Sequence, residues 1–255
     1  DLFKSWREAR HLSQLGLATE AEISQKHLSF IESGRAVPSR DMVVRLAEHL
    51  DVPLRERNVL LLAAGYAPLY PEHTLDAPAL AAARQAMEIV LKGHEPYPAL
   101  AIDRHWTMVA SNAAVTALLD GVDPELLRPP VNVMRLSLHP RGLGPRIANL
   151  AEWRAHLLER LRRQYRLTRD EFIDALVKDL SAFPGRAGAT PPRGAAHAVV
   201  VPLQLRTKTG VLSFFSTTTV FGTPTEVTLS ELSLEAFYPA DAETAAALRA
   251  LALPK

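Results

Sequence analysis

The chain of 255 residues contains no cysteine. This absence excludes disulfide bonds, cysteine-ligated zinc sites and thiol nucleophiles. The chain also has no run of about 18 apolar residues, the length that a membrane-spanning helix needs, and its first residues form no apolar signal region. We therefore expect a cytoplasmic protein without a membrane partner.

A large excess of charge of either sign is also missing, because the formal net charge is +1. Hydrophobic residues make up 47% of the chain, which is enough for one or two globular domains and argues against wholesale disorder. With a net charge this small, any surface for a nucleic acid must arise from local clustering of charge.

Recognisable catalytic motifs are absent as well. We find no Gly-x-Ser-x-Gly elbow, no glycine-rich phosphate loop and no His-Glu-x-x-His helix. The nine histidines are scattered, so their spacing predicts no metal site. We expect no catalytic residue, no metal and no cofactor. An enzyme fused to a second domain stays an alternative, which clustering of His105 and His139 with a carboxylate in one cleft would favour.

Proline and a change of pattern divide the chain into two regions. Residues 1–66 have the apolar spacing of five short helices, with Gly34 and Gly65 as helix stops. Residues 67–78 contain three prolines and no periodicity, which is typical of a linker. Residues 79–255 alternate between helical and strand patterns, so we expect an all-α domain followed by an α+β domain.

The second domain is expected to hold a five-strand antiparallel sheet with flanking helices. We expect helices over residues 79–92, 112–119, 150–165, 170–180 and 242–251, and strands over residues 99–103, 106–110, 198–207, 211–221 and 226–238. Thr168 is the expected N-cap of the helix that follows it. Residues 184–194 have the composition of a Gly/Pro loop, and residues 207–210 that of a hairpin turn.

Residues 13–34 read as two short helices joined by a tight turn, the second capped by Ser24. Ile23, Leu28 and Ile31 would bury the back of the second helix. Its front then presents small polar side chains suited to the DNA major groove: Ser24, Gln25, Lys26, His27 and Ser29. An ordinary amphipathic helix with a solvated polar face is the alternative interpretation.

Individual side chains in this region suit particular DNA contacts. Gln25 matches the edge of an adenine, and Lys26 suits a guanine or a phosphate. Gln14 at the start of the preceding helix, together with Arg35 and Arg40, suits the phosphate backbone. From residue 24 to 40, three basic residues stand against one glutamate, a local charge of +2.

These residues resemble the Xre/lambda-repressor-like helix-turn-helix family. The resemblance is carried by the run Leu12-Ser13-Gln14, by residues 28–35 and by the Pro38-Ser39 start of the fourth helix. It implies binding to double-stranded DNA as a homodimer, with half-sites about 34 Å apart. Glu22 occupies the place in the turn where the family usually has glycine. A left-handed conformation there would cost about 1–2 kcal/mol, and a reshaped turn is the alternative.

The second domain offers candidates for a ligand pocket. Large apolar side chains that could line it are Trp106, Met108, Val109, Met134, Leu136, Leu138, Trp153, Phe214, Phe221 and Phe237. Polar side chains that could hold a head group are Asn112, Asn132, Arg135, His139 and Arg146. Residues 132–166 carry eight arginines against two glutamates, a net charge of +6. A plain core, a solvated basic face and additional DNA-backbone contacts remain alternatives.

Residues 79–250 are similar to the PAS-like ligand-binding domain of MmyB-like transcription regulators. The matching stretches are residues 98–106, 111–114, 132–140, 149–153 and 232–239. The resemblance implies a bacterial regulator whose DNA binding responds to a small hydrophobic ligand, with a fatty acid as the leading candidate effector. A second domain that only dimerises remains the alternative.

Overall fold

The computed structural model describes residues 2–184, 201–208, 210–222 and 224–252. Contacts divide the chain into two compact units, with the division inside the proline-containing segment, between His73 and Thr74. The first unit also takes in Arg166–Thr168 and Thr223–Ser230, and the second contains the remainder. Each unit is described by itself below.

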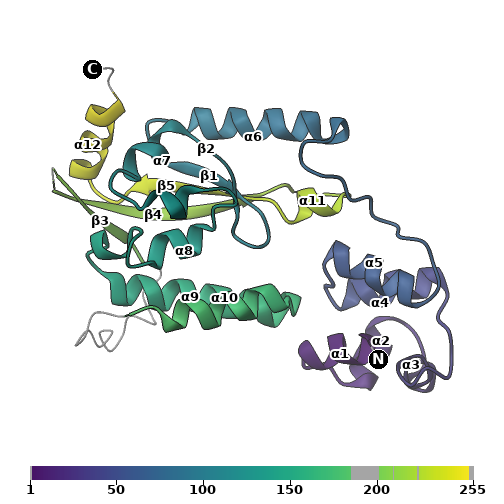
Figure 1. Cartoon of the computed structure of the whole chain (residues 1–255). Helices are drawn as coiled ribbons and strands as arrows, with labels where there is room; N and C mark the ends of the chain where they lie inside the picture. Colours follow the sequence, from purple (N-terminus) through teal and green to yellow (C-terminus); the bar gives the residue numbers. More distant parts are fainter. Residues whose placement is uncertain (1, 185–200, 209, 223, 253–255) are drawn as a thin grey trace. The chain divides into compact units, whose positions relative to one another are not determined.

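The first unit contains the five helices that the sequence predicts. They are α1 (Leu2–Ala9), α2 (Gln14–Glu20), α3 (Gln25–Glu32), α4 (Arg40–His49) and α5 (Leu54–Ala63) (Figure 1). Ser13, Ser24 and Ser39 cap α2, α3 and α4, each accepting a hydrogen bond from the backbone N–H three residues on. Apolar residues from all five helices form one core.

Each helix of this unit is followed by a residue in the left-handed backbone conformation. These residues, which have positive φ, are His11, Glu22, Gly34, Asp51 and Gly65. At the end of α2, Ile23 N donates to Ala18 O at 2.9 Å and Glu22 N donates to Thr19 O at 3.2 Å. This is the Schellman pattern, which glycine adopts most easily. Of the two alternatives for Glu22, the structure shows the left-handed conformation, with a φ of +54°.

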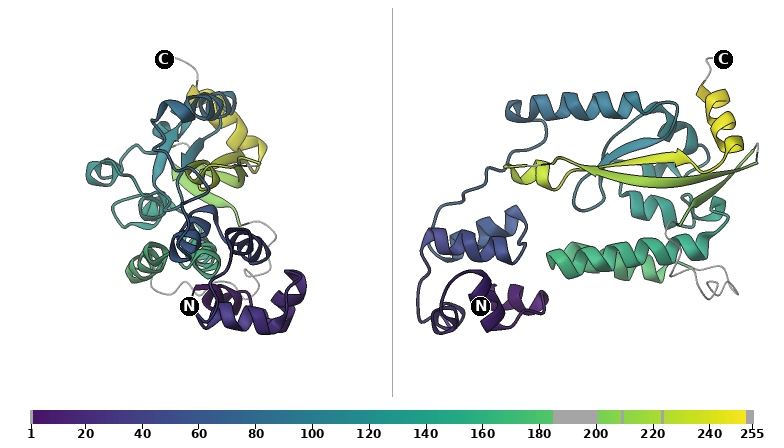
Figure 2. Two further views of the ribbon diagram at one scale, coloured as in Figure 1. Left: turned by 90° about the vertical axis from the view of Figure 1, so that its right-hand side faces the viewer. Right: turned by 180° about the vertical axis from the view of Figure 1, so that it is seen from behind.

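The second unit is built on the expected five-strand antiparallel sheet. Its strands are β1 (Ala99–Ile102), β2 (Met108–Ser111), β3 (Leu203–Thr207), β4 (Gly210–Val220) and β5 (Ser233–Pro239). Their order across the sheet is β2-β1-β5-β4-β3, so the last strand in the sequence lies at the centre. Figure 2 shows the long β4 and β5 running side by side.

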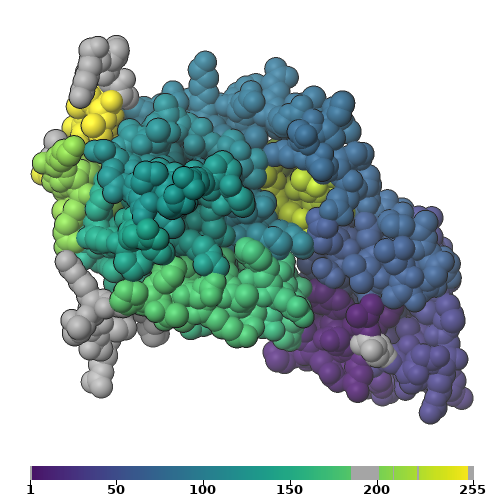
Figure 3. Space-filling view, viewed as in Figure 1, coloured from purple at the N-terminus to yellow at the C-terminus, as the bar shows by residue number. Residues whose placement is uncertain are grey.

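Helices cover both faces of this sheet. The α-helices of the unit are α6 (Ala81–Gly93), α7 (Ala113–Leu118), α8 (Val133–Leu138), α9 (Leu150–Thr168), α10 (Glu171–Ala182) and α12 (Ala242–Ala252), and the short 3-10 turns are η1 (Pro78–Leu80), η2 (Pro124–Leu127) and η3 (Gly144–Arg146). Alternate residues of β1 face opposite sides. Ala99 and Ala101 pack with α6, whereas Leu100 and Ile102 join the larger core with α9 and α10. The surfaces of α9 and α10 form one continuous layer in Figure 3.

Two expectations about this unit were wrong in detail. The strand expected over residues 226–238 is shorter, because Val227–Ser230 form the helical turn α11 and only Ser233–Pro239 pair in the sheet. Thr168 does not cap the next helix. It ends α9, and Asp170 caps α10 by accepting a hydrogen bond from Phe172 N at 2.9 Å. The Gly/Pro loop beyond residue 184 and the start of the strand expected from residue 198 fall outside the described residues.

Candidate DNA-reading face and ligand cavity

Helix α3 separates an apolar back from a polar front. Leu28 and Ile31 are buried in the core of the first unit. On the other side Ser24, Gln25, Lys26 and His27 are exposed, and Ser29 is half-buried. The front is therefore open to a partner, and the apolar back fixes its orientation, as the periodicity predicts.

A buried polar network holds α3 against α1 and α2. Arg7 donates from Nε and Nη2 to the two carboxylate oxygens of Glu32, at 2.6 and 2.9 Å. Gln14 Nε2 donates to the same carboxylate at 2.8 Å. The amide expected to contact a phosphate is thus engaged inside the protein in this structure. Burial by itself raises the pKa of Glu32, but hydrogen bonds from Arg7 and Gln14 outweigh it, so the pKa is lowered.

This network changes the charge that the DNA-reading region presents. Because Glu32 is buried and neutralised by Arg7, the charged side chains left at the surface between residues 24 and 40 are all basic. Arg35 and Arg40 are exposed. Lys26 places its ammonium 5.7 Å from the centre of the Phe30 ring. The local excess of positive charge is larger than the sequence count of +2 indicates.

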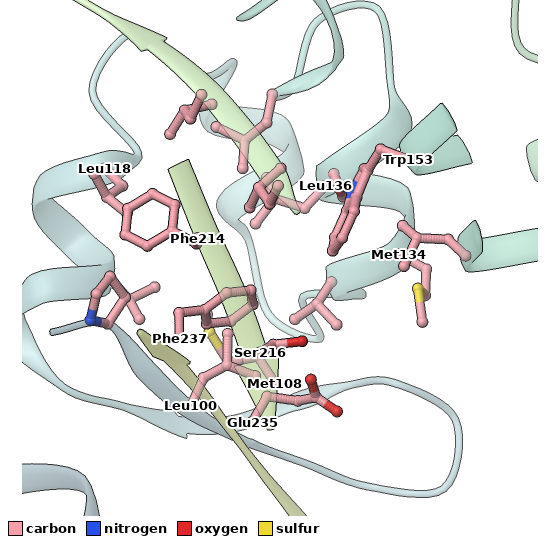
Figure 4. Close-up of a pocket in the computed structure, with 18 of the residues that line it drawn as sticks. Leu100, Met108, Leu118, Met134, Leu136, Trp153, Phe214, Ser216, Glu235 and Phe237 are labelled. Carbon is pink, nitrogen blue, oxygen red and sulfur yellow. Dashed lines mark hydrogen bonds between the residues drawn. The ribbon is translucent and has the colours of Figure 1, made fainter. Parts of the chain in front are cut away.

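The second unit contains a mainly apolar cavity of about 110 Å³ on the α9 side of its sheet. Seven of the ten apolar residues named as a possible wall line it: Trp106, Met108, Met134, Leu136, Trp153, Phe214 and Phe237. Val109, Leu138 and Phe221 do not line it. Side chains from β1, β4, β5, α7 and α8 complete the wall, as Figure 4 shows. For comparison, an engineered apolar cavity of about 150 Å³ binds benzene.

One part of the wall is polar. Arg160 of α9 and Glu235 of β5 line the cavity and form an ion pair, in which Glu235 is only 4% exposed. Thr218 donates to Glu235 Oε1 at 2.8 Å. The guanidinium of Arg160 lies 4.5 Å from the centre of the Trp106 ring. Ser216 of β4 also lines the cavity, and Figure 4 draws it on the same side as Glu235.

The polar residues expected to hold a head group are not among those lining this cavity. Asn112 and Asn132 cap α7 and α8. Arg135 pairs with Asp179, and Arg146 donates to the carbonyls of Leu118 and Asp120 at the end of α7. His139 follows α8 and accepts a hydrogen bond from Arg141 N. Each of the five thus makes contacts that hold backbone or surface elements together.

Sequence reasoning missed the pair that does line the cavity, although a signal was present. Arg160 lies seven residues after Trp153 and three after Leu157, on the apolar stripe of α9. Glu235 lies two residues before Phe237, which places both on one face of β5. A charged residue at such a core-facing position needs a buried partner. Which partner it meets depends on the tertiary structure.

His105 and His139, whose clustering would favour an enzyme, have different neighbours. His105 shares a hydrogen bond of 2.9 Å with Asp170 and stacks on Phe172, whereas His139 packs edge-on against Phe183. Burial, and then the charge of Arg160, lower the pKa of His156. Among the described residues, no group of three or more His, Asp or Glu side chains could hold a metal ion. Within the same residues, no helix combines the length and apolar character that crossing a membrane requires.

Comparisons with known proteins agree with this division. The family model described as Helix-turn-helix matches residues 3–57, and the one described as MmyB-like transcription regulator ligand binding domain matches residues 83–251. No curated protein matches the chain. One solved structure, titled "Structure of an RNA-binding Light-Oxygen-Voltage Receptor", matches at 12% identity and a TM-score of 0.26, and covers 98% of this chain. The chain spans 60% of the length of that protein.

The two family models lie on the two units. The helix-turn-helix match covers α1 to α4 and the start of α5, which include the exposed front of α3. The ligand-binding match covers α6 and the five strands, which include the cavity. Since that second match covers more than half of the sequence, the chain belongs to the MmyB-like transcription regulators, with a DNA-binding helix-turn-helix followed by a ligand-binding domain.

Proposed function

We propose that this protein is a bacterial regulator that binds specific double-stranded DNA as a homodimer in the cytoplasm, and that a small fatty-acid-like molecule in its cavity controls this binding. The exposed amide, hydroxyl and basic side chains on the front of α3 support the DNA part of the proposal. Gln25 reads a base, Ser24, Lys26, His27 and Ser29 contact bases or phosphates, and Arg35 and Arg40 hold the backbone.

The observation that carries the ligand part is the cavity itself, which has an apolar wall with one polar patch. This pattern is typical of a small-molecule site. Met108 and Met134 make parts of the wall adaptable, so a chain longer than the cavity of about 110 Å³ enters by displacing them. The strand order β2-β1-β5-β4-β3 supports a PAS-like domain.

The ligand acts by favouring one geometry of the dimer and so setting the spacing of the two α3 helices. It has this effect only if it binds one geometry better than the other. A ligand with equal affinity for both geometries leaves DNA binding unchanged.

Two measurements test the proposal. Purified protein is incubated at low ionic strength with a library of genomic fragments, and we expect a subset to be enriched. Delipidated protein is then heated with and without a saturated fatty acid, and we expect a higher melting temperature with it. Equal recovery of all fragments would contradict the DNA part. An unchanged melting temperature across chain lengths would favour a domain that only dimerises.

A further inference from the structure

One short segment of the ligand-binding region of the sequence belongs to the helix-turn-helix unit. The helical turn α11 (Val227–Ser230), which lies between β4 and β5 in the sequence, groups with Asp1–His73 in the first unit. The family model of the ligand-binding domain spans residues 83–251 and so includes this turn. The connection between two strands of the sheet is therefore part of the unit that carries α3.

Three hydrogen bonds join α11 and the residue before it to the end of the proline-containing segment, all inside the first unit. Val227 N donates to Pro71 O at 2.9 Å. His73 uses both of its backbone groups, because its N–H donates to Glu226 Oε1 at 2.7 Å and its carbonyl accepts from Thr228 Oγ1 at 2.6 Å. Val227 is completely buried. The turn is therefore docked on this segment.

Glu226 is the buried carboxylate of this contact, with an exposed fraction of 7%. Its Oε2 accepts a hydrogen bond from Leu229 N at 2.7 Å, while its Oε1 accepts the bond from His73. One side chain thus closes the helical turn and fixes it to the segment beside it. Connections between strands are ordinarily exposed to solvent, so a buried carboxylate beside a buried valine indicates a specific contact.

The segment on which α11 docks is itself fixed to α5. Asn58 Oδ1 accepts from the backbone N–H groups of Leu69 and Tyr70 at 3.0 and 3.1 Å, and its Nδ2 donates to Tyr70 O at 2.7 Å. Arg55 pairs with Glu72 at 2.6 Å, and α11 itself lies against α5. Because α5 contributes to the core that buries the back of α3, packed elements connect α11 to the DNA-reading helix.

In the other direction along the chain, α11 continues directly into the strands of the cavity wall. Only Glu231 and Leu232 separate it from β5, and Leu232 is buried in the core shared with α6. Strands β4 and β5 pair as far as Val220 and Ser233, and both contribute residues to the cavity wall. A link of this length spans at most about 10 Å when fully extended. It has little slack to absorb a shift of β5.

A second segment of the ligand-binding region, Arg166–Thr168 at the end of α9, also belongs to the first unit. There Arg10 Nη2 donates to Leu167 O at 3.2 Å, in a hydrogen bond exposed to solvent. The contact of α11 instead buries Glu226 and Val227. We therefore expect α11 to be the stronger of these two connections.

We infer that α11 transmits the state of the cavity to the helix-turn-helix within one chain. This inference rests on the proposed function and names the contact through which the ligand changes the position of α3. Ligand entry displaces β4 and β5, α11 moves the segment that ends at His73, and α5 passes the change to the core behind α3. The coupling is the difference in ligand affinity between the two arrangements. Undocking α11 should therefore remove the response and leave both binding sites intact.

The test uses full-length protein, a DNA fragment enriched from the genomic library and sodium decanoate as the ligand probe. The dissociation constant for the fragment is measured with and without saturating decanoate, and for wild-type protein we expect the two values to differ by about tenfold. The fragment must change the affinity for decanoate by the same factor, because coupling between two binding sites is reciprocal.

Val227→Asp places a charge at a completely buried position and should undock α11. We expect the ratio of the two dissociation constants to fall below about twofold, with ligand-free DNA affinity and decanoate affinity within about threefold of wild type. The matched control is Thr225→Asp, which adds the same charge at an exposed position of the same connection and should keep the wild-type ratio.

Glu226→Ala is the second variant, and it replaces Val227→Asp if that protein does not fold. It removes the acceptor of the backbone N–H groups of His73 and Leu229. Hydrogen exchange at these two amides should accelerate by about tenfold, and the ratio should again fall. Unchanged exchange would contradict the docked state of α11 and overturn the inference.

The outcomes separate this inference from the proposed function. A wild-type ratio in folded Val227→Asp or Glu226→Ala would overturn the role of α11 and leave the ligand-controlled regulator standing. Decanoate that binds wild-type protein without changing its DNA affinity would overturn ligand control and the role of α11 with it. Failure of decanoate to bind wild-type protein would overturn the fatty-acid part of the proposed function as well as this inference.

Discussion

Each unit of this protein buries a glutamate against an arginine, and the two pairs differ in what remains open. In the first unit, Arg7 meets both oxygens of Glu32, and Gln14 adds a third hydrogen bond. In the second, the bonds to Glu235 all reach one oxygen, and the pair lies in the wall of a cavity. The closed pair ties helices together, whereas the pair in the cavity wall leaves Glu235 Oε2 and the Nε and Nη1 groups of Arg160 without a hydrogen bond to the described residues.

The difference between the two pairs follows the kind of partner that each unit binds, DNA for the helix-turn-helix and a small molecule for the ligand-binding domain. In the first unit the buried carboxylate of Glu32 is fully hydrogen-bonded within the protein. The polar front of α3 is exposed to solvent, as recognition of DNA requires. In the second unit Arg160 and Glu235 line a mainly apolar cavity. Apolar walls with a few polar groups are typical of small-molecule sites. One charge pattern, an arginine beside a glutamate, therefore lies in the helical core of one unit and in the cavity wall of the other.

The largest expected effect comes from breaking the closed pair. Arg7→Met leaves Glu32 buried without its cation, and we expect the first unit to lose about 3–5 kcal/mol of unfolding free energy. Arg160→Met should cost the second unit less, about 1–3 kcal/mol, because Thr218 still binds Glu235 and the site opens to the cavity. Urea unfolding monitored by circular dichroism measures both. The double variant Arg7→Met/Glu32→Leu should recover most of the unfolding free energy that Arg7→Met loses. Equal losses in Arg7→Met and Arg160→Met would contradict the difference between the two pairs.

The outward face of α3 is tested by its effect on specificity. Gln25→Ala should weaken binding to the cognate site by about 1–3 kcal/mol and relax one base position. Arg35→Ala should weaken binding to cognate and random DNA alike, because a phosphate contact carries no sequence information. Titration of both variants against both DNAs at one salt concentration makes the comparison. Equal loss on both DNAs in Gln25→Ala would contradict the base-reading role.

A smaller effect is expected at the turn that sets the angle of α3. Glu22 holds a positive φ that glycine adopts without strain. Glu22→Gly should therefore raise the stability of the first unit by about 1 kcal/mol, measured as a shift in its unfolding midpoint. Gly34→Ala at the equivalent position after α3 is the matched control and should lower stability. A fall in stability for Glu22→Gly would mean that the Glu22 side chain makes a compensating contact.

The last prediction concerns how the ionisation of Glu32 makes the stability of the first unit depend on pH. Since the pKa of Glu32 is lowered in the folded state, its stabilising contribution is complete above the unfolded value of about 4.3 and is lost as the pH falls through the folded value. Wild-type protein should therefore exceed Glu32→Gln in melting temperature at pH 7, and the gap should narrow below about pH 4. A gap that stays constant down to pH 3 would contradict the closed pair as its source.

The sequence predicted the first unit closely because its signals are local. Serine caps, helix stops and apolar spacing act within a few residues, and the five helices follow them. For the second unit the sequence predicted the number of strands, since alternation also acts locally. Of the ten apolar residues named for its cavity, Val109, Leu138 and Phe221 do not line it. The strand expected over residues 226–238 was wrong because a helical turn interrupts a run with the composition of a strand.

By itself the sequence determined the helix-turn-helix, the α+β character of the second domain and the large side chains available for a cavity. Tertiary structure alone decided which charges meet. Arg7 and Glu32 are 25 positions apart, and Arg160 and Glu235 are 75 positions apart. Pairing over such separations depends on how helices and strands pack, which no short-range pattern encodes. For the same reason Arg135 and Arg146 were poor guides to the cavity, and Arg160 on the apolar stripe of α9 is the arginine that lines it.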